Sequence, residues 1–219
     1  MVEELPGKTR FSPQLKTLRV DDELVVSRGQ RVGEPSSVLT VSTPANDSST
    51  VALAQLESAC SLRNELDASW AARPMGLVHA RERVPLVMED PGGPLLDGLV
   101  RDPPDVEEFL RLAIGLAFAL GVPHKRGLIH KGTKPASMLG DLATRQVWLN
   151  SFGFCSRTPR ESQAPNSPEA IAGTLVYMAS EHEDRINPSV NSRADLYSCS
   201  VTLDEGLTGR FELRPLGGY

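Results

Sequence analysis

Short apolar runs separated by turn residues occupy the first ninety residues, and this pattern predicts a layer of β-strands. Arg28, Gly29 and Gly33 fall between two of the runs and predict a turn there. The last two runs are close enough in sequence to pair as a hairpin. The expected strands are residues 23–27, 37–42, 75–79 and 84–88.

The spacing changes in residues 50–66, where Leu53, Leu56, Cys60 and Leu62 recur at helical intervals. One helix is therefore expected within the strand-rich region. The run Glu-Asp-Pro-Gly-Gly-Pro at 89–94 then interrupts any regular element, because it holds two prolines and two glycines. We place the boundary between two lobes there.

A well-marked helix is predicted after this boundary. Asp105 is the expected N-cap, with Glu108 three positions later as in a capping box, and Pro123 is expected to end the helix. The wide apolar face predicts that the helix is largely buried. That face comprises Leu110, Ala113, Ile114, Ala117, Phe118 and Leu120.

A second apolar helix is expected from Asp195 onward. Taken together, the pattern predicts an α+β protein with three parts. Residues 1–20 form an N-terminal extension, residues 21–93 a β-rich lobe with a hinge at 89–93, and residues 94–219 a mainly helical lobe.

Composition narrows the function classes. The 219 residues are 40% hydrophobic with a net charge of −5 and no basic stripe, which argues against a nucleic-acid binder. Cys60, Cys155 and Cys199 are far apart, so neither a zinc site nor a disulfide framework is expected. We expect no metal site, no secretory signal and no membrane segment, and we expect a cytoplasmic location.

Four motifs in residues 127–198 indicate a function class. Residues 127–139 read Gly-Leu-Ile-His-Lys-Gly-Thr-Lys-Pro-Ala-Ser-Met-Leu, and residues 151–153 read Ser-Phe-Gly. Residues 173–181 read Gly-Thr-Leu-Val-Tyr-Met-Ala-Ser-Glu, and residues 192–198 read Ser-Arg-Ala-Asp-Leu-Tyr-Ser. In this order and at these spacings, the motifs resemble the lower lobe of serine/threonine protein kinases.

The resemblance implies a two-lobed protein-kinase-like fold whose helical lobe lacks its last helices. It also implies a role in signal transduction. Residues 86–93 and 127–135 further resemble the N-terminal kinase-like module of bacterial hybrid sensor proteins, which join a serine/threonine-kinase-like domain, an ATPase-like segment and a histidine kinase. A protein partner or a parent signalling protein is therefore expected.

The resemblance also shows which catalytic positions differ. His130 and Lys134 fall in register with the kinase catalytic loop, but Gly132 stands where that loop has its catalytic aspartate. Ser137 stands at the magnesium-binding asparagine, and Ser151 at the metal-binding aspartate of Asp-Phe-Gly. These replacements predict that phosphotransfer is lost.

The expected nucleotide site is altered as well. The resemblance places Glu89, Asp90, Leu139 and Ser151 around an ATP cleft, and Pro91 replaces a backbone N–H donor of the hinge.

The remaining nucleotide-holding groups are also missing. The strand at 37–42 has no lysine, and the helix glutamate is replaced by Ala59, with Glu57 two residues away. The glycine-rich loop is reduced to Gly29 and Gly33. ATP and magnesium are therefore expected as cofactors only if activity is retained.

Structural residues of the family pattern are kept. Asp195 is expected to accept hydrogen bonds from the backbone of the catalytic loop, and Pro135 and Leu139 to shape that loop. Three hypotheses stay open: an inactive pseudokinase; a weak ATP-binding serine/threonine kinase that recruits other carboxylates, such as Asp141 or Glu183; and a decayed fragment of a larger sensor gene.

Overall fold

The computed structural model describes residues 15–20, 24–44, 50–78, 84–98, 105–141, 143–157, 177 and 192–209. The chain divides into two compact units. The first comprises Met1–Gly92 together with Trp148–Phe154, and the second comprises Gly93–Val147 and Cys155–Tyr219. The short return segment Trp148–Phe154 therefore belongs to the first unit although the chain on both sides of it belongs to the second.

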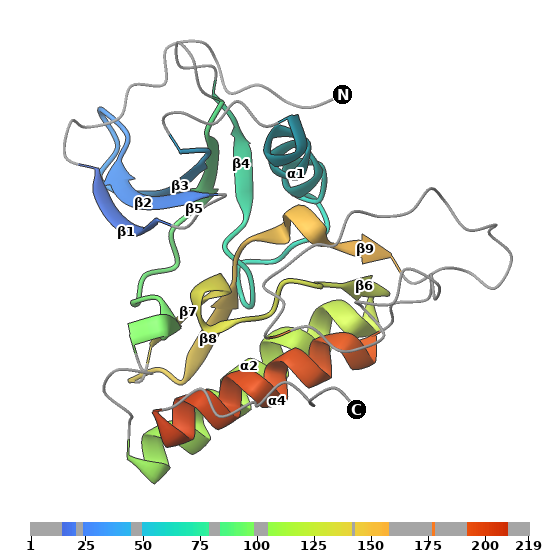
Figure 1. Ribbon diagram of the computed structural model, residues 1–219. Helices are drawn as coiled ribbons and strands as arrows, with labels where there is room; N and C mark the ends of the chain where they lie inside the picture. The colour runs from blue at the N-terminus through green and yellow to red at the C-terminus, as the bar shows by residue number, and fades with distance from the viewer. Residues whose placement is uncertain are drawn as a thin grey trace, which may run out of the picture. The chain divides into compact units, whose positions relative to one another are not determined.

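The first unit is built on a five-stranded sheet with the order β1-β2-β3-β5-β4 (Figure 1). All neighbouring strands in it are antiparallel. A helix, α1 (Thr50–Ser61), follows β3 in the chain. The strands are β1 (Lys16–Val20), β2 (Val25–Gln30), β3 (Ser37–Ser42), β4 (Pro74–Leu77) and β5 (Leu86–Glu89).

All four predicted strands are present, three of them with shifted ends. The expected hairpin of β4 and β5 is confirmed, since Leu77 pairs with Leu86. The expected turn at 28–33 is confirmed only for residues 31–33, because residues 28–30 lie in β2 and the turn begins at Arg31. β1 lies in the stretch that the sequence analysis assigned to an N-terminal extension.

The core of the first unit forms where the sheet and the return segment bury apolar side chains. Val38, Val78 and Val87 pack together, and the indole of Trp70 is fully buried. Trp70 also meets the ring of Phe152 edge to face, with ring centroids 6.3 Å apart. Aromatic pairs of this geometry are stabilising beyond the area that they bury.

The second unit centres on two helices that lie side by side, α2 (Val106–Lys125) and α4 (Ser192–Thr208) (Figure 1). Around them stand β6 (Leu128–Ile129) paired with β9 (Ser156–Arg157), and β7 (Met138–Asp141) paired with β8 (Gln146–Leu149). Short 3-10 turns complete it: η1 (Leu96–Gly98) and η2 (Pro135–Ser137) belong to this unit, whereas η3 (Phe152–Phe154) belongs to the first.

The N-terminus of α2 is as predicted: the side chain of Asp105 accepts a hydrogen bond from the N–H of Glu108 at 2.9 Å. The predicted end is wrong, because Pro123 lies inside the last turn and the helix continues to Lys125. A proline at this point removes one helical hydrogen bond without stopping the last turn.

The predicted buried face of α2 is also largely wrong. The buried residues are Leu112, Gly115, Leu116, Ala119, Leu120 and Pro123. Of the residues expected inside, only Leu120 is buried; Leu110, Ile114, Ala117 and Phe118 are exposed. The helix is apolar on nearly every side, so the spacing alone does not tell which side faces the core.

Candidate functional site

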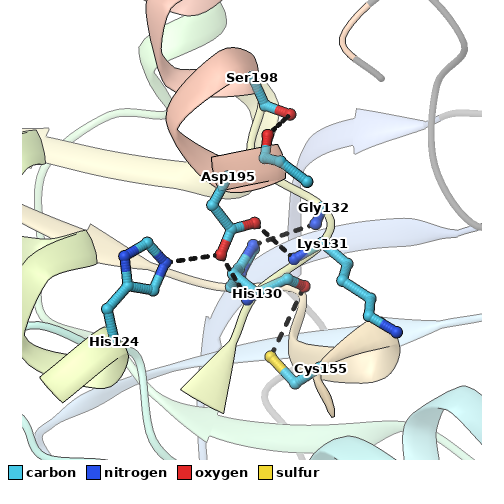
Figure 2. Close-up of polar contacts among 8 residues, drawn as sticks. His124, His130, Lys131, Gly132, Cys155, Asp195 and Ser198 are labelled. Atoms are coloured by element: carbon cyan, nitrogen blue, oxygen red, sulfur yellow. Dashed lines mark hydrogen bonds and ion pairs between the residues drawn. The ribbon is translucent and has the colours of Figure 1, made fainter. Parts of the chain in front are cut away.

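The loop between β6 and β7 is anchored by a buried carboxylate on α4. Asp195 is fully buried and accepts hydrogen bonds from the backbone N–H groups of His130 and Lys131, both at 2.7 Å (Figure 2). Its Oδ2 also lies 2.8 Å from Nε2 of His124 on α2. The expected contact of Asp195 with the loop backbone is thereby confirmed. One carboxylate thus joins both helices to the loop.

The environment keeps this carboxylate ionised. Burial by itself raises the pKa of Asp195, but the hydrogen bond with His124, the electrostatic effect of His130 and the two backbone N–H groups outweigh it. The pKa of Asp195 therefore lies below its ordinary value of 3.8. A buried carboxylate with this many donors stabilises one conformation of the loop.

Two cysteines lie near the same carboxylate. Burial, and then the negative charge of Asp195, raise the pKa of the Cys199 thiol to about 11. Burial chiefly raises the pKa of Cys155 as well, and its Sγ lies 3.7 Å from the carbonyl oxygen of His130. Both thiols are therefore protonated near neutral pH and serve as packing groups rather than nucleophiles.

The segment from Gly132 to Ser137 of the loop is held by hydrogen bonds within the loop. Ser137 is fully buried; its Oγ lies 2.6 Å from the carbonyl oxygen of Gly132 and 2.8 Å from that of Lys134. The same Oγ accepts a hydrogen bond from the N–H of Lys134 at 2.9 Å. The N–H of Gly132 donates to Nδ1 of His130 at 3.3 Å. Ser137 and Gly132 thus form hydrogen bonds within the loop itself.

Tyr177 connects a further segment to α4. Its hydroxyl donates to a carboxylate oxygen of Glu205 at 2.5 Å, and Oγ of Ser198 lies 2.5 Å from its carbonyl oxygen. The motif positions Gly173, Thr174 and Glu181 around it lie outside the described residues. Tyr177 and Ser198 are therefore the described contact between the 173–181 motif and the helix.

The Ser-Phe-Gly segment and the hinge belong to the first unit. Oγ of Ser151 donates to the side-chain oxygen of Asn150 at 2.6 Å. Gly153 approaches α1 so closely that a Cβ there would lie 2.8 Å from Cβ of Gln55. The segment therefore packs against the helix that follows β3.

At the hinge, the carboxylate of Asp90 is almost fully buried and is held by an arginine. Arg28 donates a hydrogen bond from an Nη atom to one carboxylate oxygen at 2.9 Å, and its Nε forms an ion pair with the other oxygen at 2.7 Å. Ser37 Oγ and the N–H of Gly92 also donate to it, at 2.7 and 3.1 Å. The side chain of Glu89, by contrast, forms a long ion pair with Arg73, at 3.8 Å.

The comparisons with known proteins agree with this arrangement of motifs. The chain is 31% identical over 126 residues to the serine/threonine-protein kinase PknB of Mycobacterium leprae, covering 57% of this chain and 20% of that protein. It is 33% identical over 91 residues to PknB of Mycobacterium tuberculosis, covering 42% of this chain and 14% of that protein. A probable serine/threonine-protein kinase of Streptomyces coelicolor is 32% identical over 106 residues, 48% of this chain and 15% of that protein.

This chain contains a protein kinase-like domain. It is homologous, over part of its length, to bacterial serine/threonine protein kinases. The chain spans about a fifth or less of the length of these relatives. No protein-family model matches it. The fold is accordingly α+β and kinase-like, with a sheet in the N-terminal region and helices in the C-terminal region.

The positions of the strands correct the assignment of the glycine-rich loop to Gly29 and Gly33. Gly29 lies within β2, opposite Val38 of β3, and Gly33 lies in the turn between those two strands. In kinases, the glycine-rich loop covers the phosphates from the connection of the first two strands. That connection here is residues 21–24, which read Asp-Asp-Glu-Leu and hold no glycine.

The remaining predicted site residues fall into both units. His130, Gly132, Lys134, Ser137 and Leu139 lie in the second, where Leu139 is fully buried and bridges to Leu95. The others lie in the first: Glu89, Asp90 and Ser151.

Sequence reasoning missed two supporting residues, His124 and Tyr177. A histidine in the last turn of a helix as apolar as α2 is a signal that could have marked the first. No helix among the described residues is long and apolar enough to cross a membrane.

Proposed function

We propose that this kinase-like domain is a pseudokinase: a folded binding or regulatory module that performs no phosphotransfer by the usual kinase mechanism. The observation that carries the proposal is in the loop at 130–137, where Ser137 stands at the position of a metal ligand and its hydroxyl is engaged by the loop's own backbone. The position of the catalytic base is Gly132, which has no side chain.

The metal positions do not fit magnesium as kinases hold it. Mg²⁺ prefers carboxylate and phosphate oxygens, and kinases supply an asparagine and an aspartate. Here both positions are serines. The hydroxyl of Ser151 is directed at Asn150, and the hydroxyl of Ser137 is enclosed in its loop.

The phosphate positions do not fit either. A kinase needs a lysine on β3 paired with a glutamate on the following helix. β3 holds no lysine, Ala59 is buried at the position expected for the glutamate, and Glu57 is exposed on another side of α1.

The alternative of a weak kinase needs substitute carboxylates. Asp141 is the described candidate, but its Oδ1 already accepts hydrogen bonds from the backbone N–H groups of Ala143 and Thr144 in its own turn. The second candidate, Glu183, lies outside the described residues. Lys134 is retained, and the sequence of its loop, residues 130–139, contains no aspartate or glutamate.

Two finer statements belong to the same proposal. We place the domain among the N-terminal kinase-like modules of bacterial hybrid sensors, supported by residues 86–93 and 127–135. We also place it in the cytoplasm, since its three cysteines are free thiols. The coding sequence downstream tests the first statement: a histidine kinase region in any frame supports it, and its absence counts against it.

The decisive experiment compares phosphotransfer and nucleotide binding on the same sample. With labelled ATP, magnesium and a general acceptor protein, the domain should give no signal above a blank, while an active bacterial kinase does. In parallel, 1 mM magnesium-ATP should leave the melting temperature unchanged. If the dissociation constant were 100-fold below the nucleotide concentration, binding would add about 2.7 kcal/mol to the free energy of unfolding. The melting temperature would then rise by roughly 5–10 °C.

The two measurements separate the hypotheses. Robust autophosphorylation would overturn the pseudokinase proposal. A thermal shift without phosphotransfer would keep the loss of catalysis and assign the domain a nucleotide-binding role. A matched variant, Gly132→Asp with Ser137→Asn and Ser151→Asp, restores the three side chains. It should remain inactive, because the β3 lysine and its glutamate are still missing.

A further inference from the structure

The outward side of α2 lacks the polar surface that a solvent-facing helix normally carries. Val106, Leu110, Ile114 and Phe118 expose 65, 54, 68 and 56% of their surface. No charged residue lies between Arg111 and His124 in the sequence. A surface helix usually places charged and polar residues on this side, and contiguous exposed apolar surface marks an interaction site.

Four residues follow a 4-3-4 spacing, which forms one narrow stripe along the helix. Leu110, Ile114 and Ala117 in this stripe are exposed and Gly121 is half-buried, with the exposed Phe118 beside them. This is the spacing of a helix-pairing seam, in which each side chain fits between residues of the facing helix. Ala117 and Gly121 are small, so they leave room for a facing backbone or a large side chain.

The stripe is complementary to itself when one copy is reversed. When a second copy of the helix is turned about the midpoint between Gly115 and Leu116, Leu110 of one copy lies opposite Gly121 of the other. Ile114 then lies opposite Ala117 of the other copy. Large side chains therefore face small ones in both layers. A two-fold interface requires this kind of self-complementary surface.

The charges at the two ends of α2 agree with the same reversed pairing. Glu107 is exposed at the first turn, where it forms an ion pair with Arg111 of the same helix, and Lys125 is exposed at the last turn. Each lies about 13–14 Å along the axis from the midpoint, at 1.5 Å per residue. An antiparallel pair places the acidic end of one copy on the basic end of the other, whereas a parallel pair places like charges together.

We propose that the outward stripe of α2 is an interface with a second copy of this chain, formed as an antiparallel helix pair. Leu110 packs on Gly121 of the second copy and Ile114 on its Ala117, with Glu107 beside its Lys125. One helix face is a small interface, below the ~1,000 Å² typical of stable complexes, so the dimer is weak and concentration-dependent. The proposal is independent of whether the domain transfers phosphate.

Sedimentation equilibrium of the full chain from about 1 µM to 1 mM tests it. The expected result is a reversible monomer–dimer equilibrium. Ala117→Ile, which overfills the seam, and Ile114→Ala, which empties it, should each weaken dimerisation by about tenfold or more. The double variant Ile114→Ala with Ala117→Ile exchanges the large and the small side chain of this pair, so it should restore dimerisation.

Charge and surface controls complete the design. Glu107→Lys alone should weaken the dimer by about fivefold, and Glu107→Lys with Lys125→Glu should recover it. Leu207→Ala removes an exposed apolar side chain from α4 and should change nothing. Circular dichroism checks that each variant keeps its helical content, which is expected because the altered side chains are exposed.

Three results would overturn the proposal. They are a chain that stays monomeric at 1 mM, a dimer that Ala117→Ile does not weaken, and an exchange variant that stays as weak as its single parents. The first would leave the stripe to another occupant, either a different protein or a further segment of a longer chain. The other two would place any self-association on another surface.

Discussion

The carboxylate of Asp195 offers the sharpest test of how the loop is held. Replacing it by asparagine keeps the size and one acceptor oxygen but substitutes an N–H donor for the other oxygen. Three donors point at the carboxylate: the N–H groups of His130 and Lys131 and the ring of His124. At least one buried donor then loses its acceptor, whichever way the amide is turned.

The size of the effect follows from burial. A buried donor left without a partner costs about 1–3 kcal/mol, and hydrogen bonds to a charged group lose strength when the charge is removed. We therefore expect Asp195→Asn to lower the free energy of unfolding by about 2–4 kcal/mol. That is a large fraction of the 5–15 kcal/mol typical of whole domains.

The assay is urea unfolding followed by circular dichroism, with Asp204→Asn on the same helix as the matched control. Asp204 is exposed, so its variant should lie within about 0.5 kcal/mol of the wild type. If Asp195→Asn also changed stability by less than about 0.5 kcal/mol, the carboxylate would not be the anchor of the loop.

The pH dependence of the same variant gives an independent check. Because the folded-state pKa of Asp195 is lowered, the unfolded chain binds more protons in the range between the two pKa values. The contribution of Asp195 is therefore complete above its ordinary pKa of 3.8 and is lost as the pH falls through the folded-state value. The stability gap between the wild type and Asp195→Asn should narrow below about pH 4, and a gap that widened there would refute this account.

Three further predictions concern packing. Gly115→Ala should destabilise the fold by about 1–3 kcal/mol, because its Cβ would lie 2.6 Å from a backbone carbonyl oxygen. Gly121→Ala is the matched control: its Cβ meets nothing within 4 Å, so it should stabilise the fold by up to about 1 kcal/mol. Urea unfolding at low protein concentration measures both. A double-mutant cycle of Trp70→Leu and Phe152→Leu should give a coupling energy of about 0.5–1.5 kcal/mol, and additive losses would contradict their contact. The thiol of Cys199, with its pKa raised to about 11, should react with iodoacetamide at pH 7.5 only in unfolded protein, as measured by mass spectrometry; labelling of the native chain would contradict its burial.

The features visible in the sequence were those that local chemistry specifies. Asp105 caps α2 as predicted, and the strand Ser37–Ser42 was predicted at both ends, because an aspartate before a helix and a β-branched run each act over a few residues. Asp195 was assigned correctly through the family resemblance, since a carboxylate that binds a loop 65 residues away leaves no local signal.

Other features depended on partners that the sequence does not reveal. β1 was missed because its strand character comes from pairing with β2 across a bulge between Thr17 and Arg19. Gly29 suggested a turn, but its position opposite Val38 places it inside a strand. The orientation of α2 was misjudged because an evenly apolar helix gives no preferred side; burial there is decided by the elements that pack on it.

The return segment Trp148–Phe154 has a consequence for how this chain is made. Within the first unit, the N–H of Leu149 donates to the carbonyl of Trp70, its own carbonyl accepts from the N–H of Ala72, and the indole N–H of Trp148 donates to the carbonyl of Ala68, all at 2.9 Å. A ribosome that has finished Gly92 must still add about sixty residues before these donors and acceptors exist, roughly 3–12 s of synthesis. During that interval Trp70 lacks its ring contact with Phe152 and its backbone hydrogen bond with Leu149. The first unit is therefore synthesised first but cannot finish folding first. A shorter chain that ended at the hinge would leave Trp70 without the return segment that packs on it.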